Sequence, residues 1–400
     1  MKLITSLGTG VYKTTRYQWG DRECETSLFP EALVCWLEPK TTVVLLTEVA
    51  QQHDNWKQLQ QVLDGKTTLQ PVRIPEGRSE QELWQIFDAV QSNVDDVEEV
   101  VIDITHAFRS LPLIFFVVTA FLRAVRDVKV KHILYGCFVA ENQPSPVLDL
   151  TLMVELLDWM EGVRRFKKLG DAEFIGQALI DTQASLYHQS TQDVKPKHLK
   201  TVGQAMRDLS SEMRSLRVWQ MMKTADRLLT EIKPAEAEAQ KWSKPFALLI
   251  EQIRQQVEPI AHSQPDTLDE QNLRKQIAMM RFMLERGQIL QALLLQREWL
   301  VNFALWKVGQ KEWLKREVRE PVERGLGEVA QAWLRNREVA TGKLAESVDS
   351  KTLSLLAELW NRIQDLRNDP AHCGMRENAA DYRKLHDSVE GFLRQLEALL

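Results

Sequence analysis

The sequence VVIDITHAFRSLP occupies residues 100–112 and decides how the first part of this chain folds. It begins with a short run of Val and Ile, which is typical of a strand buried on both faces. The run is then interrupted by four polar side chains, Asp103, Thr105, His106 and Arg109. Pro112 suits the first turn of a helix, because proline lacks an N–H that this turn would leave unpaired. The stretch therefore predicts a buried strand, a polar loop and a helix that begins near Ser110.

The rest of the first 150 residues repeats this alternation of strand and helix. Strands are predicted at Lys2–Ser6, Thr42–Thr47, Leu69–Ile74, Val97–Ile104 and Val130–Phe138. Helical spacing of apolar residues is found at Val49–Leu63, Ser79–Val90 and Ser110–Val125. Strands that alternate with helices imply parallel crossovers. We therefore expect residues 1–150 to form a doubly wound α/β domain with a parallel sheet.

The composition changes after residue 150, where β-branched runs disappear and Leu, Ala, Glu, Gln and Arg dominate. This pattern predicts an all-helical region. Breaks are expected at Lys195-Pro196, Lys233-Pro234, Lys244-Pro245 and Ser263–Asp266. Asp266 or Thr267 is expected to cap a helix that opens a further domain. The predicted domains are thus residues 1–150, a helical linker region at 151–265 and a helical domain at 266–400.

Overall composition excludes several classes of protein. The chain has 400 residues, 44% of them hydrophobic and 27% charged, and a formal charge of -5, so it is globular and is not a strongly basic nucleic-acid coat. Its four cysteines lack CxxC spacing, and its start lacks the features of a signal peptide. The most apolar segment, 111–122, is about half of the ~20 residues that a membrane span needs. We expect a cytoplasmic protein that does not contact membranes.

A second polar loop lies beside the first one in the predicted sheet. The first strand leads into Ser6-Leu-Gly-Thr-Gly-Val-Tyr12, whose glycines allow backbone N–H groups to approach a phosphate closely. Ligands of open parallel sheets bind beyond the carboxyl ends of the strands. An NAD site is not expected, because Lys13 replaces the third glycine of its fingerprint. The two loops suit a phosphodiester ligand, and Asp103 either contacts it or orders its own loop by accepting N–H groups.

The two loops together resemble the CARF sensor domain of CRISPR-associated proteins of the DxTHG group. The segments concerned are Leu7–Tyr12 and Asp103–Pro112, with Ala107 where that group has glycine. The resemblance implies a Rossmann-type fold that dimerises and binds cyclic oligoadenylate across the dimer axis, cyclic tetra-adenylate being favoured over hexa-adenylate. Ligand-binding residues carried over from the resemblance are Gly8, Thr9, Gly10, Tyr12, Asp103, Thr105, His106 and Arg109.

A second resemblance lies near the C-terminus, in Arg367-Asn-Asp-Pro-Ala-His372. This Arg-Asn-x-x-Ala-His sequence resembles the active-site motif of HEPN ribonucleases, and a helical HEPN domain that follows a CARF domain fits the known CARF–HEPN architecture. The resemblance implies an endoribonuclease for single-stranded RNA, with Arg367, Asn368 and His372 as catalytic residues. A helix around residues 288–308 is expected beside the motif helix, with Arg297 and Glu298 either at the cleft or as an exposed ion pair.

Elementary chemistry supports this activity. RNA carries its own nucleophile, the 2′-hydroxyl, so cleavage needs only proton transfer and stabilisation of charge on the phosphoryl oxygens. His372 could transfer protons near neutral pH, and Arg367 offers a planar fork to phosphate. A two-fold homodimer would bring two such pairs into one cleft. No metal ion or cofactor is expected.

Two other functions stay open at this point. The sensor domain could itself hydrolyse its cyclic ligand, near Thr9, Thr105 or His106, and the helical part would then only assemble dimers. Alternatively, the sensor could control a transcriptional regulator, although the sequence shows no compact helix-turn-helix with a basic recognition helix.

Overall fold

The computed structural model divides into two compact units, Met1–Asp158 and Trp159–Leu400. It describes residues 1–107, 110–139, 143–188, 195–335, 342–371, 373, 375, 377 and 381–400, without the side chains of Asp369 and Ala371. Helix α6 (Thr151–Leu169) contains the boundary between the units. The division of the helical part at residue 265 stays a prediction.

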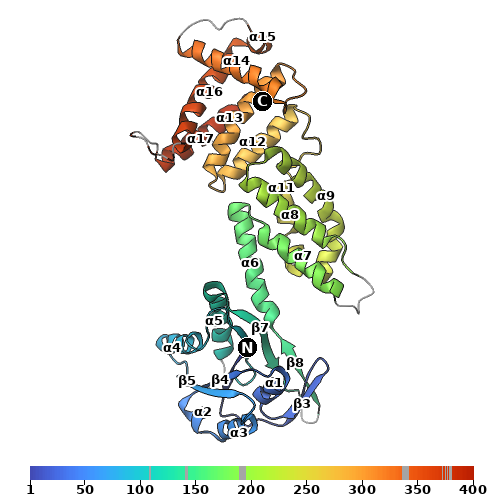
Figure 1. Cartoon of the computed structure of the whole chain (residues 1–400), viewed down its shortest axis with the longest axis vertical. Coiled ribbons are helices and arrows are strands. Elements are labelled where there is room, and N and C mark those ends of the chain that lie inside the picture. The colour runs from blue at the N-terminus through green and yellow to red at the C-terminus, as the bar shows by residue number, and fades with distance from the viewer. Residues whose placement is uncertain are drawn as a thin grey trace. The chain divides into compact units, whose positions relative to one another are not determined.

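The first unit contains one sheet of eight strands, ordered β3-β2-β8-β7-β6-β1-β4-β5. Strands β3, β4, β5, β7 and β8 of this sheet are labelled in Figure 1. The strands are β1 (Lys2–Leu7), β2 (Thr15–Trp19), β3 (Arg22–Thr26), β4 (Thr41–Leu46), β5 (Thr68–Arg73), β6 (Glu99–Asp103), β7 (Lys129–Gly136) and β8 (Pro144–Asp149). The five strands β5-β4-β1-β6-β7 are all parallel. Their order is that of a doubly wound Rossmann sheet, which reverses between β1 and β6.

The α/β expectation is therefore confirmed, but the sheet is mixed and not wholly parallel. Strands β2 and β3 form an antiparallel hairpin, and β8 pairs antiparallel with β7. The hairpin turn contains Gly20 in the left-handed region, at φ 59°, where a residue without Cβ is favoured. The hairpin lies at the sheet edge, where β2 alternates buried with exposed residues and β3 buries only Thr26, so it lacks the continuous apolar run of β4.

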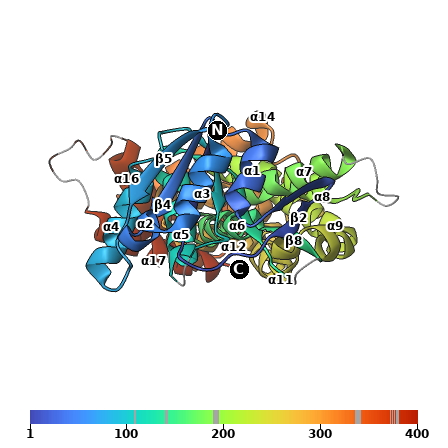
Figure 2. The ribbon, with the colours of Figure 1, turned by 90° about the horizontal axis from the view of Figure 1, so that it is seen from below.

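Helices cover both faces of this sheet. Alternate residues of β1 separate the two cores: Leu3 packs with Phe29 and Leu59 on one face, and Ile4 packs with Phe115 on the other. The first face carries α1 (Phe29–Leu37), α2 (Glu48–Gln52) and α3 (Asp54–Leu63), of which α2 and α3 lie beside β4 in Figures 1 and 2. The second face carries α4 (Glu80–Gln91) and α5 (Leu111–Arg126). The single helix predicted at 49–63 is broken at His53 into α2 and α3.

The second unit is helical throughout its described residues, as predicted. After α6 its helices are α7 (Glu173–His188), α8 (Leu199–Arg214), α9 (Val218–Trp242), α10 (Lys244–Ala247), α11 (Ile250–Val257), α12 (Glu270–Leu284), α13 (Ile289–Lys307), α14 (Arg316–Leu334), α15 (Lys343–Ser347), α16 (Ser350–Ala371) and α17 (Tyr382–Glu397). Helix α13 packs against α12, α14, α16 and α17, and most of its residues are buried. It is therefore the central helix of the C-terminal part of this unit.

Helices α7 and α8 make a backbone-to-backbone contact at two glycines. A Cβ on Gly176 would lie 2.5 Å from the carbonyl oxygen of Gly203, and a Cβ on Gly203 would clash in the same way with the carbonyl of Gly176. Only glycine at both positions permits this approach.

Two of the expected helix boundaries are wrong. Pro234 lies inside α9, which continues to Trp242, because tertiary packing of Ile232 and Ala235 outweighs the hydrogen bond that proline removes. Helix α12 is capped by Asp269, whose side chain accepts from the N–H of Asn272, and not by Asp266 or Thr267. Among the described residues, none of the helices has the length and hydrophobicity that crossing a membrane would require.

Candidate functional site

The two polar loops meet where the strand order reverses. Strands β1 and β6 are parallel neighbours, with Lys2 opposite Val100 and Ile4 opposite Ile102. The loops that follow Leu7 and Asp103 therefore leave the same edge of the sheet. This is the place where open α/β sheets bind their ligands.

Asp103 holds the second loop together. It is 1% exposed, and its carboxylate accepts hydrogen bonds from the Thr5 hydroxyl at 2.7 Å and from the Thr105 N–H at 2.8 Å. Burial raises the pKa of Asp103 to about 6, against the opposing effect of the hydrogen bonds from Thr105 and Thr5. Of the two roles that the sequence left open, this geometry is that of a residue that orders its loop.

Thr105 connects this loop to the neighbouring strand. Its hydroxyl oxygen accepts a hydrogen bond of 2.8 Å from the N–H of Gly136, the last residue of β7. A Cβ on Gly136 would lie 2.7 Å from the Tyr17 ring and 2.9 Å from the Phe29 ring. The glycine is thus needed for close packing beneath the loop, and the sequence alone gave no sign of this.

His106 is a neutral, half-buried side chain. Its Nε2 accepts a hydrogen bond of 3.2 Å from the Phe29 N–H, and its ring lies 3.9 Å from that of Tyr12 between centroids. Burial lowers the pKa of His106 to about 4, so the imidazole is uncharged at neutral pH, with its proton on Nδ1. In this arrangement His106 supplies a ring surface and no positive charge for a phosphate.

The glycine loop is closed by hydrogen bonds from two side chains. The Gly8 N–H donates to the Tyr12 hydroxyl at 2.9 Å, and the Asn55 amide donates to the carbonyls of Gly8 and Gly10 at 3.0 and 2.9 Å. Burial raises the pKa of the Tyr12 hydroxyl, which stays protonated. Thr9 and Gly10 remain exposed at the tip of the loop.

Asn55 was missed by the sequence analysis. It lies 8% exposed in the first turn of α3. The available signal was its position after the predicted strand at 42–47, which ends at the same sheet edge as the two loops.

The structure brings Gly8, Tyr12, Thr105 and His106 together and leaves Thr9 and Gly10 open to solvent. Arg109 lies outside the described residues. The helix that follows, α5, has Ser110 as its N-cap residue, and the Ser110 side chain makes no capping hydrogen bond. The first turn of α5, which contains Pro112, therefore has no side-chain cap from Ser110.

The second candidate site lies in the helical unit. Arg367 is half-buried in α16 and lines a cavity of about 450 Å³, together with Arg297 and Glu298 of α13. Asn368 is exposed. His372 lies outside the described residues, so its distance from Arg367 stays untested.

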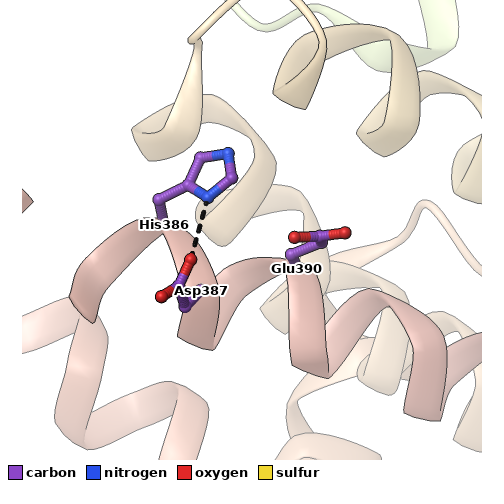
Figure 3. Close-up of side chains that lie close together, drawn as sticks. All are labelled: His386, Asp387 and Glu390. Atoms are coloured by element: carbon purple, nitrogen blue, oxygen red, sulfur yellow. Dashed lines mark hydrogen bonds and ion pairs between the residues drawn. The ribbon is translucent and has the colours of Figure 1, made fainter. Parts of the chain in front are cut away.

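One group of side chains in the described part of the chain has the composition of a metal site. His386, Asp387 and Glu390 lie on one face of α17, with ligand atoms within 4.8 Å of one another (Figure 3). The His386 ring is 3.4 Å from the Asp387 carboxylate, and Glu390 pairs with Arg394 at 2.5 Å. The Asp387 side chain is 80% exposed. Because the group is exposed and the Glu390 carboxylate already pairs with Arg394, we interpret these residues as ordinary helix surface and not as a metal site.

Comparisons with known proteins identify parts of both units. Residues 2–138 match the family model of the CARF domain of the CRISPR system endoribonuclease Csx1. Residues 155–260, for which the sequence suggested a linker, match the family model of the second domain of the CRISPR-associated protein MJ1674. MJ1674 of Methanocaldococcus jannaschii itself is 36% identical over 108 residues, which are 26% of this chain and only 17% of that protein.

The chain is also similar to a solved structure, Enterococcus italicus Csm6 bound to cyclic hexa-2′-fluoro-hexa-dAMP. The match covers the whole of this chain and 94% of the Csm6 chain, with a TM-score of 0.48 and 12% identity. The match over residues 2–138 coincides with the Rossmann-like unit and with both of its polar loops. The chain is therefore a CRISPR-associated protein that contains a CARF domain.

Proposed function

We propose that this chain is an endoribonuclease of type III CRISPR defence, activated by cyclic oligoadenylate, that cleaves single-stranded RNA without a metal ion. The observation that carries the proposal is the combination of a CARF domain at residues 2–138 with a helical unit that contains Arg367 five positions before His372. The matched CARF model is that of an endoribonuclease. The coupling of a sensor to a nuclease explains why both features occur in one chain.

The sensor ligand would lie at the sheet edge where β1 and β6 end. The exposed tip at Thr9 and Gly10 would contact its phosphates, together with Arg109 and the start of α5. The adjacent rings of Tyr12 and His106, tilted by 34° to each other, would form an uncharged floor for adenine. Cyclic tetra-adenylate is the favoured ligand, ahead of hexa-adenylate.

A homodimer would form through the outer face of α5. This helix exposes four apolar side chains at intervals of four residues, Leu113, Val117, Phe121 and Val125, at 68%, 51%, 43% and 60%. This apolar surface continues onto α4. The Phe87 ring contacts the rings of Phe121 and Trp84, and Trp84 is 59% exposed. Because α5 begins at the ligand loop, a second copy on this face would lie next to the ligand.

Dimerisation would also complete the nuclease site. One imidazole is poorly placed to serve both sides of an in-line displacement, whereas two copies provide two His372 and two Arg367 side chains. His372 would accept the proton of the 2′-hydroxyl or protonate the leaving 5′-oxygen. Arg367 would stabilise the charge on the phosphoryl oxygens, and Asn368 would orient the phosphate.

The decisive experiment measures cleavage of a fluorogenic RNA in EDTA, with and without cyclic tetra- and hexa-adenylate. We expect ligand-dependent cleavage by the parent, none by His372→Ala with ligand binding retained, and a higher activating concentration for Arg109→Ala. The control is His386→Ala, a histidine of another helix, which should cleave like the parent.

Cleavage by His372→Ala at the parental rate would contradict the proposal. Incubation of that variant with cyclic tetra-adenylate completes the test, because linear products would assign hydrolysis to the sensor.

A further inference from the structure

The cavity that Arg367 lines has features that the cleavage reaction alone does not require. It measures about 450 Å³ and lies between the start of α9, the face of α13, the segment before α14 and the end of α16. All of these elements belong to the helical unit. Five charged residues line it, namely Arg217, Arg297, Glu298, Arg319 and Arg367.

Two of the four arginines are neutralised by carboxylates. Arg319 donates to Glu298 at 2.7 Å and to Asn302 at 2.8 Å, and Arg297 donates to Glu298 at 2.6 Å and also pairs with Glu323. The side chains of Arg297 and Arg319 are only 13% and 19% exposed. This network holds the inner wall of the cavity in place, and its charges balance.

The other two arginines are unbalanced. In the part of the chain that the structure describes, no carboxylate pairs with the side chain of Arg217 or of Arg367. Arg217 is exposed at the start of α9 and Arg367 is half-buried in α16, and both line the cavity. In addition, the buried Nε of Arg297 has no hydrogen-bond partner among the described residues. The cavity therefore has a net positive charge and unused N–H donors.

The Trp219 indole lies in the same cavity wall and is fixed by a hydrogen bond. The Trp219 Nε1–H donates to the carboxylate of Asp266 at 3.0 Å, and the Trp313 Nε1–H donates to the carbonyl of Asp266 at 2.7 Å. Trp219 is half-buried, and the Lys223 ammonium lies 5.3 Å from its ring centroid. A fixed and partly open indole beside cations is the arrangement with which proteins stack a base of a single-stranded nucleic acid.

We infer that this cavity binds one nucleotide of single-stranded RNA next to the bond that is cleaved, with its phosphate on Arg217 and Arg367 and its base against Trp219. The inference rests on the proposed function, because Arg367 links the cavity to the cleavage site. Leu294 and Leu314 also line the cavity and add apolar surface for a base to cover.

The test uses the full chain with His372→Ala, so that RNA binds and is not cut. A short fluorescent RNA that contains 4-thiouridine is titrated, then cross-linked, and the modified peptides are identified by mass spectrometry. We expect cross-links within residues 216–222 and 294–298. Arg217→Ala on this background should raise the Kd for RNA about tenfold, since a charge-assisted hydrogen bond to phosphate is lost.

Matched variants separate a binding role from a structural one. Arg217→Lys should recover part of the affinity, and Trp219→Phe should bind more tightly than Trp219→Leu because it retains a ring. Arg316→Ala is the control, since its side chain is 88% exposed on α14 and pairs with Glu320 outside the cavity. It should bind RNA like its parent. None of these variants should change the affinity for cyclic tetra-adenylate.

The outcomes distinguish this inference from the proposed function. An unchanged Kd for Arg217→Ala, or cross-links confined to other segments, would overturn the nucleotide site even if His372→Ala abolishes cleavage. If instead His372→Ala cleaves normally while RNA cross-links to residues 216–222, the cavity binds RNA and the proposed active site is wrong.

Discussion

At the strand ends of the first unit, uncharged donors converge on one buried carboxylate, whereas in the helical unit arginines pair with glutamates. Asp103 is 1% exposed, and Thr105 and His106 are half-buried beside it. Glu298 and Glu323, which pair with Arg297, have side chains that are 46% and 38% exposed. The first arrangement fixes a loop through burial, and the second keeps charge near an open cavity. The two regions should therefore respond differently to mutation and to pH.

The largest effect is expected where the sensor loop loses its buried acceptor. Asp103→Ala leaves the Thr105 N–H without a partner and the Thr5 hydroxyl with only a 3.4 Å contact to the Ser6 carbonyl, which should lower the free energy of unfolding by about 3 kcal/mol. Urea unfolding combined with hydrogen exchange of the β1 and β6 amides would assign the loss to the first unit. Asp103→Asn retains an acceptor and should lose less than half as much. A loss below about 1 kcal/mol in Asp103→Ala would show that water replaces the carboxylate there.

A smaller effect is expected in the helical unit. Arg297→Ala removes a side chain that pairs with Glu298 and Glu323 and lies 5.1 Å from the Trp360 ring centroid. We expect a loss of about 2 kcal/mol, below that of a fully buried pair, because both carboxylates can reach water. Thermal unfolding of Arg297→Ala and of the exposed control Arg316→Ala checks this, with no measurable change in the control. Equal stability of the two variants would remove the contrast between the two regions.

The smallest effect is a dependence on pH, in which two residues of the sensor loop act in opposite directions. The folded pKa of His106 is about 4, below its ordinary 6.5, so His106 reduces the free energy of unfolding as pH falls from about 6.5 to about 4. The folded pKa of Asp103 is about 6, above its ordinary 3.8, so Asp103 adds stability as pH falls through about 6. Between pH 4 and 6 the two contributions oppose each other.

Substitution of either residue should reveal the contribution of the other. Relative to the parent, Asp103→Asn should lose roughly 1 kcal/mol per pH unit on acidification between pH 6 and 4, and His106→Gln should gain a similar amount. Urea titrations at four pH values measure both slopes. Slopes of the same sign in the two variants would contradict the opposite pKa shifts.

The sequence predicts the central parallel strands β1, β4 and β6 because each is buried on both faces over nearly its whole length, as in Val43–Leu46. It fails for the hairpin β2–β3 and for β8, whose short segments bury alternate residues only. Strands β2 and β8 pair with each other across more than 100 residues, as in Tyr17 with Ser145. Local pattern does not contain that information.

The candidate site follows the same rule. The two loops were identifiable because Gly8 and Asp103 come directly after apolar runs. The roles of individual residues depended on distant partners: His106 accepts from Phe29, 77 positions away, and Asn55 reaches Gly8 across 47. A sequence motif indicates which residues gather at an edge, and burial then decides which of them carry charge.

The glycine contact between α7 and α8 has a mechanical consequence. Helices that touch backbone to backbone at Gly176 and Gly203 cannot slide past each other or rotate without collision, so α7 and α8 behave as one rigid unit. Deformation of this segment would therefore concentrate outside the contact, for example at the turn near Gly170. A conformational change that passes through this region would move α7 and α8 together.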